Sequence, residues 1–123
     1  MATVLIVDDA PFMRKTLADL VEALGHTVVG EAENGYAAVD LYFKLRPDVV
    51  TMDITMPEFG GLEAVKVICG VDPNAKIIMV SAMGQTEFIK DAIRSGAKDF
   101  IVKPFEYERV ALAFDKLLGV GVC

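Results

Sequence analysis

Five short apolar runs recur along the chain at similar intervals. They are rich in β-branched residues and cover Thr3–Val7, Thr27–Ala32, Asp48–Met52, Lys76–Ser81 and Phe100–Val102. Several of them are apolar throughout and do not alternate apolar with polar residues. This pattern is typical of strands that are buried on both faces, as in a parallel sheet.

Helical patterns fill the segments between these runs. The first extends from Pro11, which suits the first turn of a helix, to Gly25, which suits a C-terminal cap. The others are expected between Asn34 and Pro47, over about 62–69, over about 86–94, and after Pro104. Strand and helix thus alternate five times, which predicts a doubly wound parallel sheet with helices on both faces. We expect one α/β domain over residues 1–123, with a frayed tail at 119–123.

The composition narrows the class of protein. The 123 residues are 54% hydrophobic and 24% charged, which is typical of a globular domain. The net charge of −6 argues against nucleic acid or an anionic membrane as a direct partner. No stretch approaches the roughly 20 apolar residues of a membrane helix, and the start has no basic region of a signal peptide. With only Cys69 and Cys123, we expect free thiols and a cytoplasmic protein.

Chemically active side chains follow four of the five predicted strands. They are Asp8 and Asp9, Asp53, Ser81, and Lys103. Taken singly, each has an ordinary explanation, such as helix capping for the first two or a solvated surface position for the lysine. In an open α/β sheet, however, the carboxyl ends of the strands meet at one crevice, where ligands bind. The sequence therefore predicts three carboxylates, a hydroxyl and an ammonium group at one site.

The charges in this crevice do not balance. Three carboxylates at a buried edge raise one another's pKa unless cations neutralise them, and Lys103 supplies a single positive charge. A divalent ion held by oxygen ligands would complete the site, which suits Mg²⁺. A carboxylate can also act as a nucleophile towards phosphorus. We expect Asp8 and Asp9 to hold the metal and Asp53 to be the acceptor, because it is single and lies mid-sheet between the other charged strand ends.

Several motifs together resemble the receiver domain of two-component response regulators over nearly the whole chain, from Thr3 to Leu118. They are LIVDD, PDVVTMDITMP followed by GG, SAMG, and KDFIVKPF. The segments MDITMP, SAMGQ and GAKDFIVKPF are also similar to stand-alone chemotaxis regulators of the CheY type. The resemblance implies a flavodoxin-like fold with strand order 2-1-3-4-5. It also implies a monomeric phosphoprotein of a phosphorelay, which catalyses only its own phosphorylation and dephosphorylation and is not otherwise an enzyme.

The resemblance also implies roles for the site residues. Asp53 would take a phosphoryl group from a phosphohistidine on a sensor histidine kinase. Asp9, Asp53 and the backbone carbonyl of Thr55 would bind Mg²⁺ directly, and Asp8 would act largely through water. Lys103 would contact the phosphoryl group, and its peptide bond to Pro104 is usually cis in the family.

A switch is implied by two further positions. Ser81 occupies the place of the hydroxyl that bonds a phosphoryl oxygen, and Phe100 matches the aromatic switch position, where many relatives carry tyrosine. We expect both to face outward in the unmodified protein and to move inward after phosphorylation. The reporting surface would be the helix over 86–94, the last strand and the last helix. A downstream protein target would bind there to Lys90, Arg94, Lys98, Tyr107 and Arg109, each of which also fits an ordinary solvated surface.

Alternatives to this function remain. A flavodoxin-like cofactor carrier needs a Gly-, Ser- or Thr-rich phosphate loop after the first strand, and the acidic DDAPFMR stands there. A phosphatase with an aspartyl intermediate would need a further domain to bind its substrate. A degenerate receiver that only binds a partner would not need the full set of acids and Lys103. A receiver excised from a longer regulator, or a phosphorelay intermediate, stays open.

Overall fold

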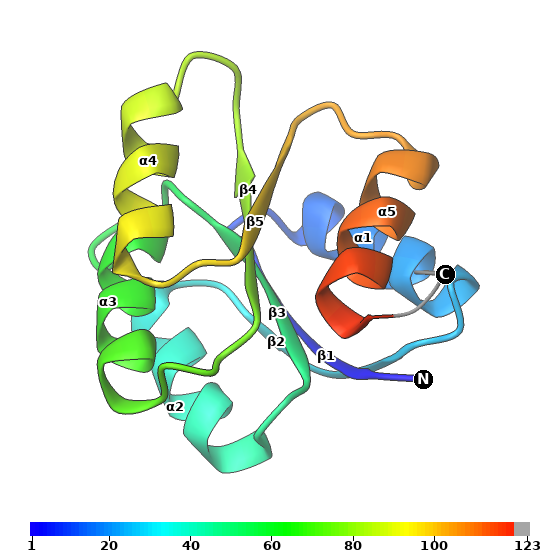
Figure 1. Cartoon of the computed structure of the whole chain (residues 1–123), viewed down its shortest axis with the longest axis horizontal. Helices are drawn as coiled ribbons and strands as arrows, with labels where there is room; N and C mark the ends of the chain where they lie inside the picture. The colour runs from blue at the N-terminus through cyan, green and yellow to red at the C-terminus, as the bar shows by residue number, and fades with distance from the viewer. Residues whose placement is uncertain (120–123) are drawn as a thin grey trace.

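Five strands alternate with five helices in the computed structural model, which describes residues 1–119. The alternation expected from the apolar runs is therefore confirmed (Figure 1). In chain order the elements are β1 (Thr3–Val7), α1 (Pro11–Ala23), β2 (Thr27–Ala32), α2 (Gly35–Leu45), β3 (Val49–Asp53), α3 (Gly61–Val71), β4 (Ile77–Ser81), α4 (Thr86–Ser95), β5 (Asp99–Val102) and α5 (Tyr107–Leu118).

The strands form one parallel sheet in the order β2-β1-β3-β4-β5, as the flavodoxin-like fold class requires. Helices α1 and α5 cover one face of the sheet, and α2, α3 and α4 cover the other (Figure 1). The chain proceeds outward to β2 on one side of β1 and to β3 on the other. The carboxyl ends of β1 and β3 therefore form the point of reversal, where ligands bind in such sheets.

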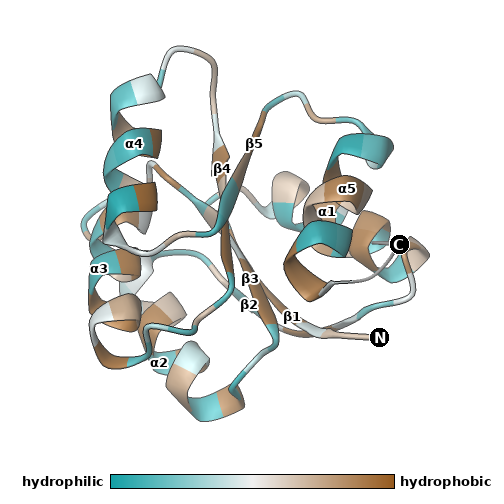
Figure 2. Cartoon of the chain, viewed as in Figure 1, coloured by the Kyte–Doolittle hydropathy of each residue, from teal (hydrophilic) through white to brown (hydrophobic). Residues whose placement is uncertain are grey.

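Each face of the sheet has its own apolar core. In β1, Leu5 and Val7 pack with α2, α3 and α4, whereas Val4 and Ile6 pack with α1 and α5. Every residue of β3 and β4 is buried, so buried and exposed residues do not alternate along these two strands. Figure 2 shows the hydrophobic colour gathered along the central strands. The site at the carboxyl edge is thereby carried on rigid, fully packed elements.

Some boundaries differ from those expected. The third strand starts at Val49, because the Asp48 carboxylate accepts hydrogen bonds from the backbone N–H of Thr3 at 2.9 Å and its hydroxyl at 3.1 Å. It ends at Asp53, which pairs with Val80. The fourth strand starts one residue later than expected and the fifth one residue earlier, and α3 is longer at both ends. Gly119 caps α5, and residues 120–123 of the expected tail lie outside the described part.

Gly61, at the start of α3, packs directly on the end of β3. Its backbone N–H donates to the carbonyl of Ile54 at 2.9 Å. A Cβ at this position would lie 2.0 Å from the carbonyl oxygen of Asp53. Only glycine permits this approach, which places the helix against the strand that presents Asp53.

Gly61→Ala is expected to lower the free energy of unfolding by about 1–3 kcal/mol, because backbone must move to admit the methyl group. Gly70→Ala is the matched control on the same helix, since a Cβ there meets nothing within 4 Å. It should raise stability by about 0.5–1 kcal/mol. Urea unfolding of both variants measures the two effects. Equal stability of the two variants would show that the loop after β3 moves to admit the methyl group without lowering the free energy of unfolding.

Tyr42 links α2 to the end of α3. Its hydroxyl donates to Oδ2 of Asp72 at 2.6 Å. Burial raises the pKa of Tyr42 above its usual range, and the hydrogen bond from Tyr42 lowers the pKa of Asp72. The bond is therefore strongest when Asp72 is ionised and Tyr42 is neutral.

Tyr42→Phe is expected to lower stability at neutral pH by an amount that disappears in acid. Because the native pKa of Asp72 is depressed, its contribution is complete above the ordinary Asp value of about 3.9 and is lost as pH falls through the native pKa. Urea unfolding of wild type and variant from pH 7 to pH 2 measures this difference. Tyr36→Phe, at an exposed position on the same helix, should show no such trend; a constant difference for Tyr42→Phe would contradict the assignment.

Candidate functional site

The carboxyl edge of the sheet holds a cluster of acids at the point of reversal. Asp8 and Asp9 follow β1, and Asp53 is the last residue of β3. Carboxylate oxygens of the three residues all lie within 4.8 Å of one another. Asp8 and Asp53 are only 1% and 6% exposed, whereas Asp9 is exposed. The structure thus brings together the three acids that were expected to meet.

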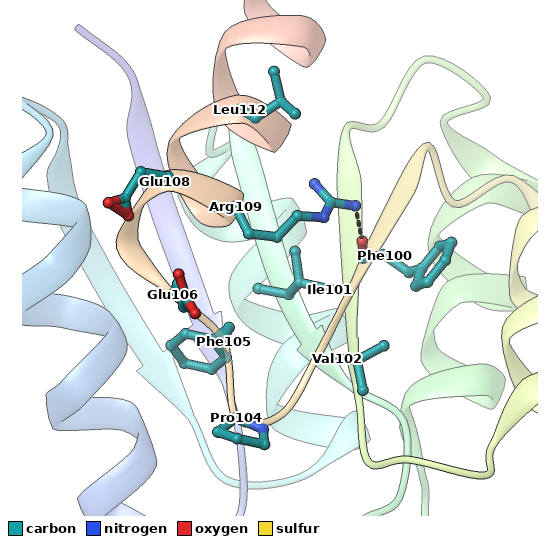
Figure 3. Close-up of a pocket in the computed structure, with 9 residues that line it drawn as sticks. All are labelled: Phe100, Ile101, Val102, Pro104, Phe105, Glu106, Glu108, Arg109 and Leu112. Carbon is teal, nitrogen blue, oxygen red and sulfur yellow. Dashed lines mark hydrogen bonds between the residues drawn. The ribbon is translucent and has the colours of Figure 1, made fainter.

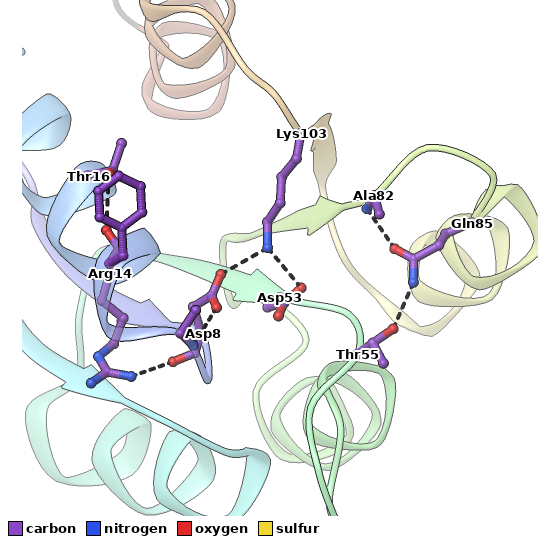
Figure 4. Close-up of polar contacts among 10 residues, drawn as sticks. Asp8, Arg14, Thr16, Asp53, Thr55, Ala82, Gln85 and Lys103 are labelled. Carbon is purple, nitrogen blue, oxygen red and sulfur yellow. Dashed lines mark hydrogen bonds and ion pairs between the residues drawn. The ribbon is translucent and has the colours of Figure 1, made fainter.

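Lys103, from the segment after β5, reaches into the same cluster. Its Nζ lies 3.2 Å from Oδ2 of Asp8 and 3.7 Å from Oδ1 of Asp53 (Figure 4). Figure 4 shows its ammonium group between the two buried acids. The Lys103–Pro104 peptide bond is cis, as the resemblance implied.

The electrostatics of Asp53 reveal a deficit of positive charge. Burial raises the pKa of Asp53 to about 6, the negative charge of Asp8 adds to this rise, and the Lys103 ammonium opposes it. One ammonium group thus does not compensate for three neighbouring carboxylates. The donor set consists of hard oxygens in an acidic pocket, which is the chemistry that Mg²⁺ prefers. The residues present therefore fit a divalent cation.

The local structure after β1 holds Asp8 in place. Its Oδ1 accepts a hydrogen bond from the backbone N–H of Ala10 at 2.9 Å. Its backbone carbonyl accepts one from Arg14 at 2.7 Å (Figure 4). Arg14 also forms an ion pair with Glu31 at 3.1 Å. Sequence reasoning did not identify Arg14, although its place in the first turn of α1 brings it near the preceding loop.

The two expected switch residues have different environments. Phe100 is 36% exposed on β5, and its expected inward movement after phosphorylation stays a prediction. Ser81, at the end of β4, is completely buried, and its expected turn toward Asp53 after phosphorylation stays a prediction. Its hydroxyl is buried without a hydrogen-bond partner among residues 1–119. A buried, unbonded hydroxyl at the edge of an acidic crevice is available to a new acceptor.

Gln85, in the loop before α4, lies on the side of the site away from Asp8 (Figure 4). Its Oε1 accepts from the backbone N–H of Ala82 at 2.7 Å, and its Nε2 donates to the hydroxyl of Thr55 at 2.7 Å. It therefore bridges the loops after β4 and β3. Sequence reasoning noted SAMGQ as a motif but assigned no role to this glutamine.

The residues expected on the partner surface do not form one uniform patch. Arg109 of α5 donates to the carbonyl of Phe100 at 2.6 Å (Figure 3). Its guanidinium group also lies 3.3 Å from the Asp99 carboxylate. Lys98 instead donates to the carbonyls of Gly96 and Pro73, at the opposite edge of the sheet from the acids. The other three expected residues are exposed: Lys90 and Arg94 of α4, which pair with Glu87 and Asp91 on their own helix, and Tyr107 of α5.

Phe100 separates two grooves on this surface. One runs along α5 and is lined by Phe105, Arg109 and Leu112, as Figure 3 shows. The other lies between Phe100 and the start of α4, where Ile89 lines it. The aromatic ring thus has open space on both sides of the strand that carries it.

Within residues 1–119, no helix has the length and apolar character needed to cross a membrane.

Comparison with known proteins gave concordant results in sequence and in structure. The model of the response regulator receiver domain family matches residues 4–115. The "Chemotaxis protein CheY" of Thermotoga maritima is 58% identical over 93% of this chain and 95% of that protein. The protein of the same name from Bacillus subtilis is 56% identical over 94% of this chain and 97% of its own length.

Solved structures match equally well. The crystal structure of the CheX-CheY-BeF3-Mg complex from Borrelia burgdorferi aligns with a TM-score of 0.90 and 37% sequence identity, over 94% of this chain and 88% of that chain. The response regulator domain of Thermotoga maritima CheB aligns with a TM-score of 0.81 and 40% identity, over 96% and 94%. Sequence and fold therefore agree with the resemblance carried by the strand-end residues.

Proposed function

The chain belongs to the response regulator receiver domain family, and on that premise we propose that Asp53 accepts a phosphoryl group from a phosphohistidine of a sensor histidine kinase. One observation carries this proposal. Asp53 is a buried carboxylate at the end of a central strand, with oxygens of Asp8 and Asp9 within 4.8 Å and the Lys103 ammonium 3.7 Å away. A nucleophile thus lies where positive charge can be collected around a transferred anion.

The transfer exchanges one bond to phosphorus for another. An oxygen of Asp53 attacks phosphorus, the phosphorus–nitrogen bond of the phosphohistidine breaks, and the electron pair remains on the imidazole nitrogen, which takes up a proton. Lys103 stabilises the charge on the phosphoryl oxygens from its position beside Asp53. Asp8, Asp9, Asp53 and the Thr55 carbonyl would hold Mg²⁺, which supplies further positive charge to those oxygens when bound.

The signal is a shift between two conformations. Ser81 has a buried hydroxyl without a partner, and a phosphoryl oxygen on Asp53 would supply the missing acceptor. The groove between Phe100 and the start of α4 lies beside the Ser81 loop, and the aromatic ring turns into it when that loop moves. The α4-β5-α5 face then differs between the two states, and a downstream protein target binds one of them more tightly.

Beryllofluoride with Mg²⁺, a mimic of the phosphoryl group, is expected to move backbone NMR resonances across residues 85–115. The physical reason is the new bond to Ser81, so Ser81→Ala should retain the mimic at Asp53 but lose most of the shifts in β5 and α5. Asp53→Asn serves as the control that excludes general salt effects. Unmoved resonances in residues 85–115 of the wild type would refute the switch.

The names of the relatives indicate the signalling pathway in which this chain acts. Relatives at 55–58% identity are named chemotaxis proteins, which supports a role in chemotaxis for this chain. We place that role in the cytoplasm. The Borrelia burgdorferi relative was crystallised with CheX, so a protein of that kind is a candidate partner here. The proposal needs no nucleic acid or membrane partner, and it takes the monomer as the active form.

A further inference from the structure

Gln85 uses its side chain in a way that helix capping does not explain. It stands at the N-cap position of α4, yet its side chain makes no cap hydrogen bond to that helix. Both of its polar ends are directed elsewhere, to the N–H of Ala82 and to the hydroxyl of Thr55, each at 2.7 Å. The side chain is half-buried between the two loops that border Asp53. It therefore connects these loops and does not stabilise the helix end.

The Ala82 N–H is the group of interest in this bridge. Ala82 directly follows Ser81, the last residue of β4, so its N–H lies beyond the residues of β4 that pair with β3 and β5. The carbonyl of Ser81 is already used by the N–H of Lys103 at 2.7 Å. The end of β4 thus offers two donors beside Asp53: the Ser81 hydroxyl, which has no partner among residues 1–119, and the Ala82 N–H, which Gln85 occupies.

We propose that Gln85 is a positioning residue that latches the β4–α4 loop in the unphosphorylated arrangement by occupying the Ala82 N–H and anchoring it to Thr55. This inference rests on the proposed function of Asp53. When the acceptor is modified, a phosphoryl oxygen competes with Gln85 Oε1 for the same donor, and the loop is released together with Ser81. The latch opposes the modified state by about the net strength of a hydrogen bond, which corresponds to a roughly three- to tenfold lower affinity for the phosphoryl group.

Gln85→Met tests the latch, because methionine has a similar shape and can make neither hydrogen bond. In NMR titrations of the full chain with Mg²⁺ present, the variant should bind beryllofluoride about three- to tenfold more tightly than wild type. Thr55→Val removes only the anchor and should tighten binding less. The double variant should equal Gln85→Met, since both changes break one bridge. Thr86→Val, an exposed hydroxyl of the same segment, is the matched control and should bind like wild type.

Two further readouts separate a latch from a merely structural role. Without beryllofluoride, the Ala82 amide proton should exchange with solvent faster in Gln85→Met than in wild type, whereas the amide protons of β4 itself should exchange no faster. Affinity for Mg²⁺ alone should stay within about twofold, because the Thr55 carbonyl is untouched.

The outcomes distinguish the two proposals. Unchanged or weaker beryllofluoride binding by Gln85→Met, or unchanged Ala82 exchange, overturns the latch. Reduced Mg²⁺ affinity also overturns it, because Gln85 would then support Thr55 and not oppose the modified state. If the wild type itself shows no response to beryllofluoride, the proposed function of Asp53 fails first, and the latch with it.

Discussion

Asp53→Asn is expected to abolish phosphorylation by acetyl phosphate. In the presence of Mg²⁺, the wild type should gain the mass of one phosphoryl group, and the variant should gain none. The amide is neutral and a much poorer nucleophile than the carboxylate, although it has the same shape and leaves the packing of β3 intact. Intact-mass spectrometry of the two proteins over time measures the effect directly. Chelation of Mg²⁺ should suppress the gain in the wild type as well.

Two controls make this result specific. Asp40→Asn changes an exposed aspartate of α2 whose side chain is 70% exposed, and it should be phosphorylated like wild type. Lys103→Met should retain some phosphorylation but at a lower rate, because it removes positive charge and not the acceptor. A phosphoryl group gained by Asp53→Asn at the wild-type rate would place the acceptor elsewhere and refute the proposed function.

Asp8→Ala and Asp9→Ala are both expected to weaken Mg²⁺ binding by about ten- to a hundredfold, the range seen when groups that support a metal are lost. The physical reason is the loss of one negative charge from a cluster of three acids. Calorimetric titration of each variant with Mg²⁺ measures the affinity. Asp19→Ala, at an exposed position on α1, is the control and should bind like wild type.

The same two variants should differ in stability without metal. Asp9 is exposed and its charge adds to that of its neighbours, so its removal should leave the fold as stable or more stable. Asp8 is buried and accepts hydrogen bonds from Lys103 and Ala10, so Asp8→Ala should cost about 1–3 kcal/mol. Urea unfolding in a chelator measures both. Equal destabilisation would contradict the different roles that the structure gives to the two neighbouring acids.

Much of the fold follows from local pattern. The continuous apolar runs of the central strands, Pro11 at the start of α1 and Gly25 after its end could be interpreted because their causes act within one element. Boundaries were less certain where distant residues decide them. The third strand starts after Asp48 because that side chain binds Thr3 from another strand. Neither residue signals this pairing in its own neighbourhood.

The sequence by itself determined the composition of the site. Residues at the carboxyl ends of parallel strands converge whatever the detail of the loops, so Asp8, Asp9, Asp53 and Lys103 could be grouped before any distance was known. The strict spacing of strand and helix enforces that convergence. The motifs then identified the family to which this arrangement belongs.

Only the tertiary structure decided how the site is held and restrained. Three contacts at the site join separate loops or elements: the bond from Arg14 to the Asp8 carbonyl, the approach of Gly61 to Asp53, and the bridge from Gln85 to Thr55. The complete burial of Ser81 likewise results from packing between elements. Such contacts depend on how far each loop extends beyond the sheet, which is set by packing between layers and not by the residues of one segment. For that reason the chemistry of this protein could be predicted from its strand ends, whereas the restraint on its switch could not.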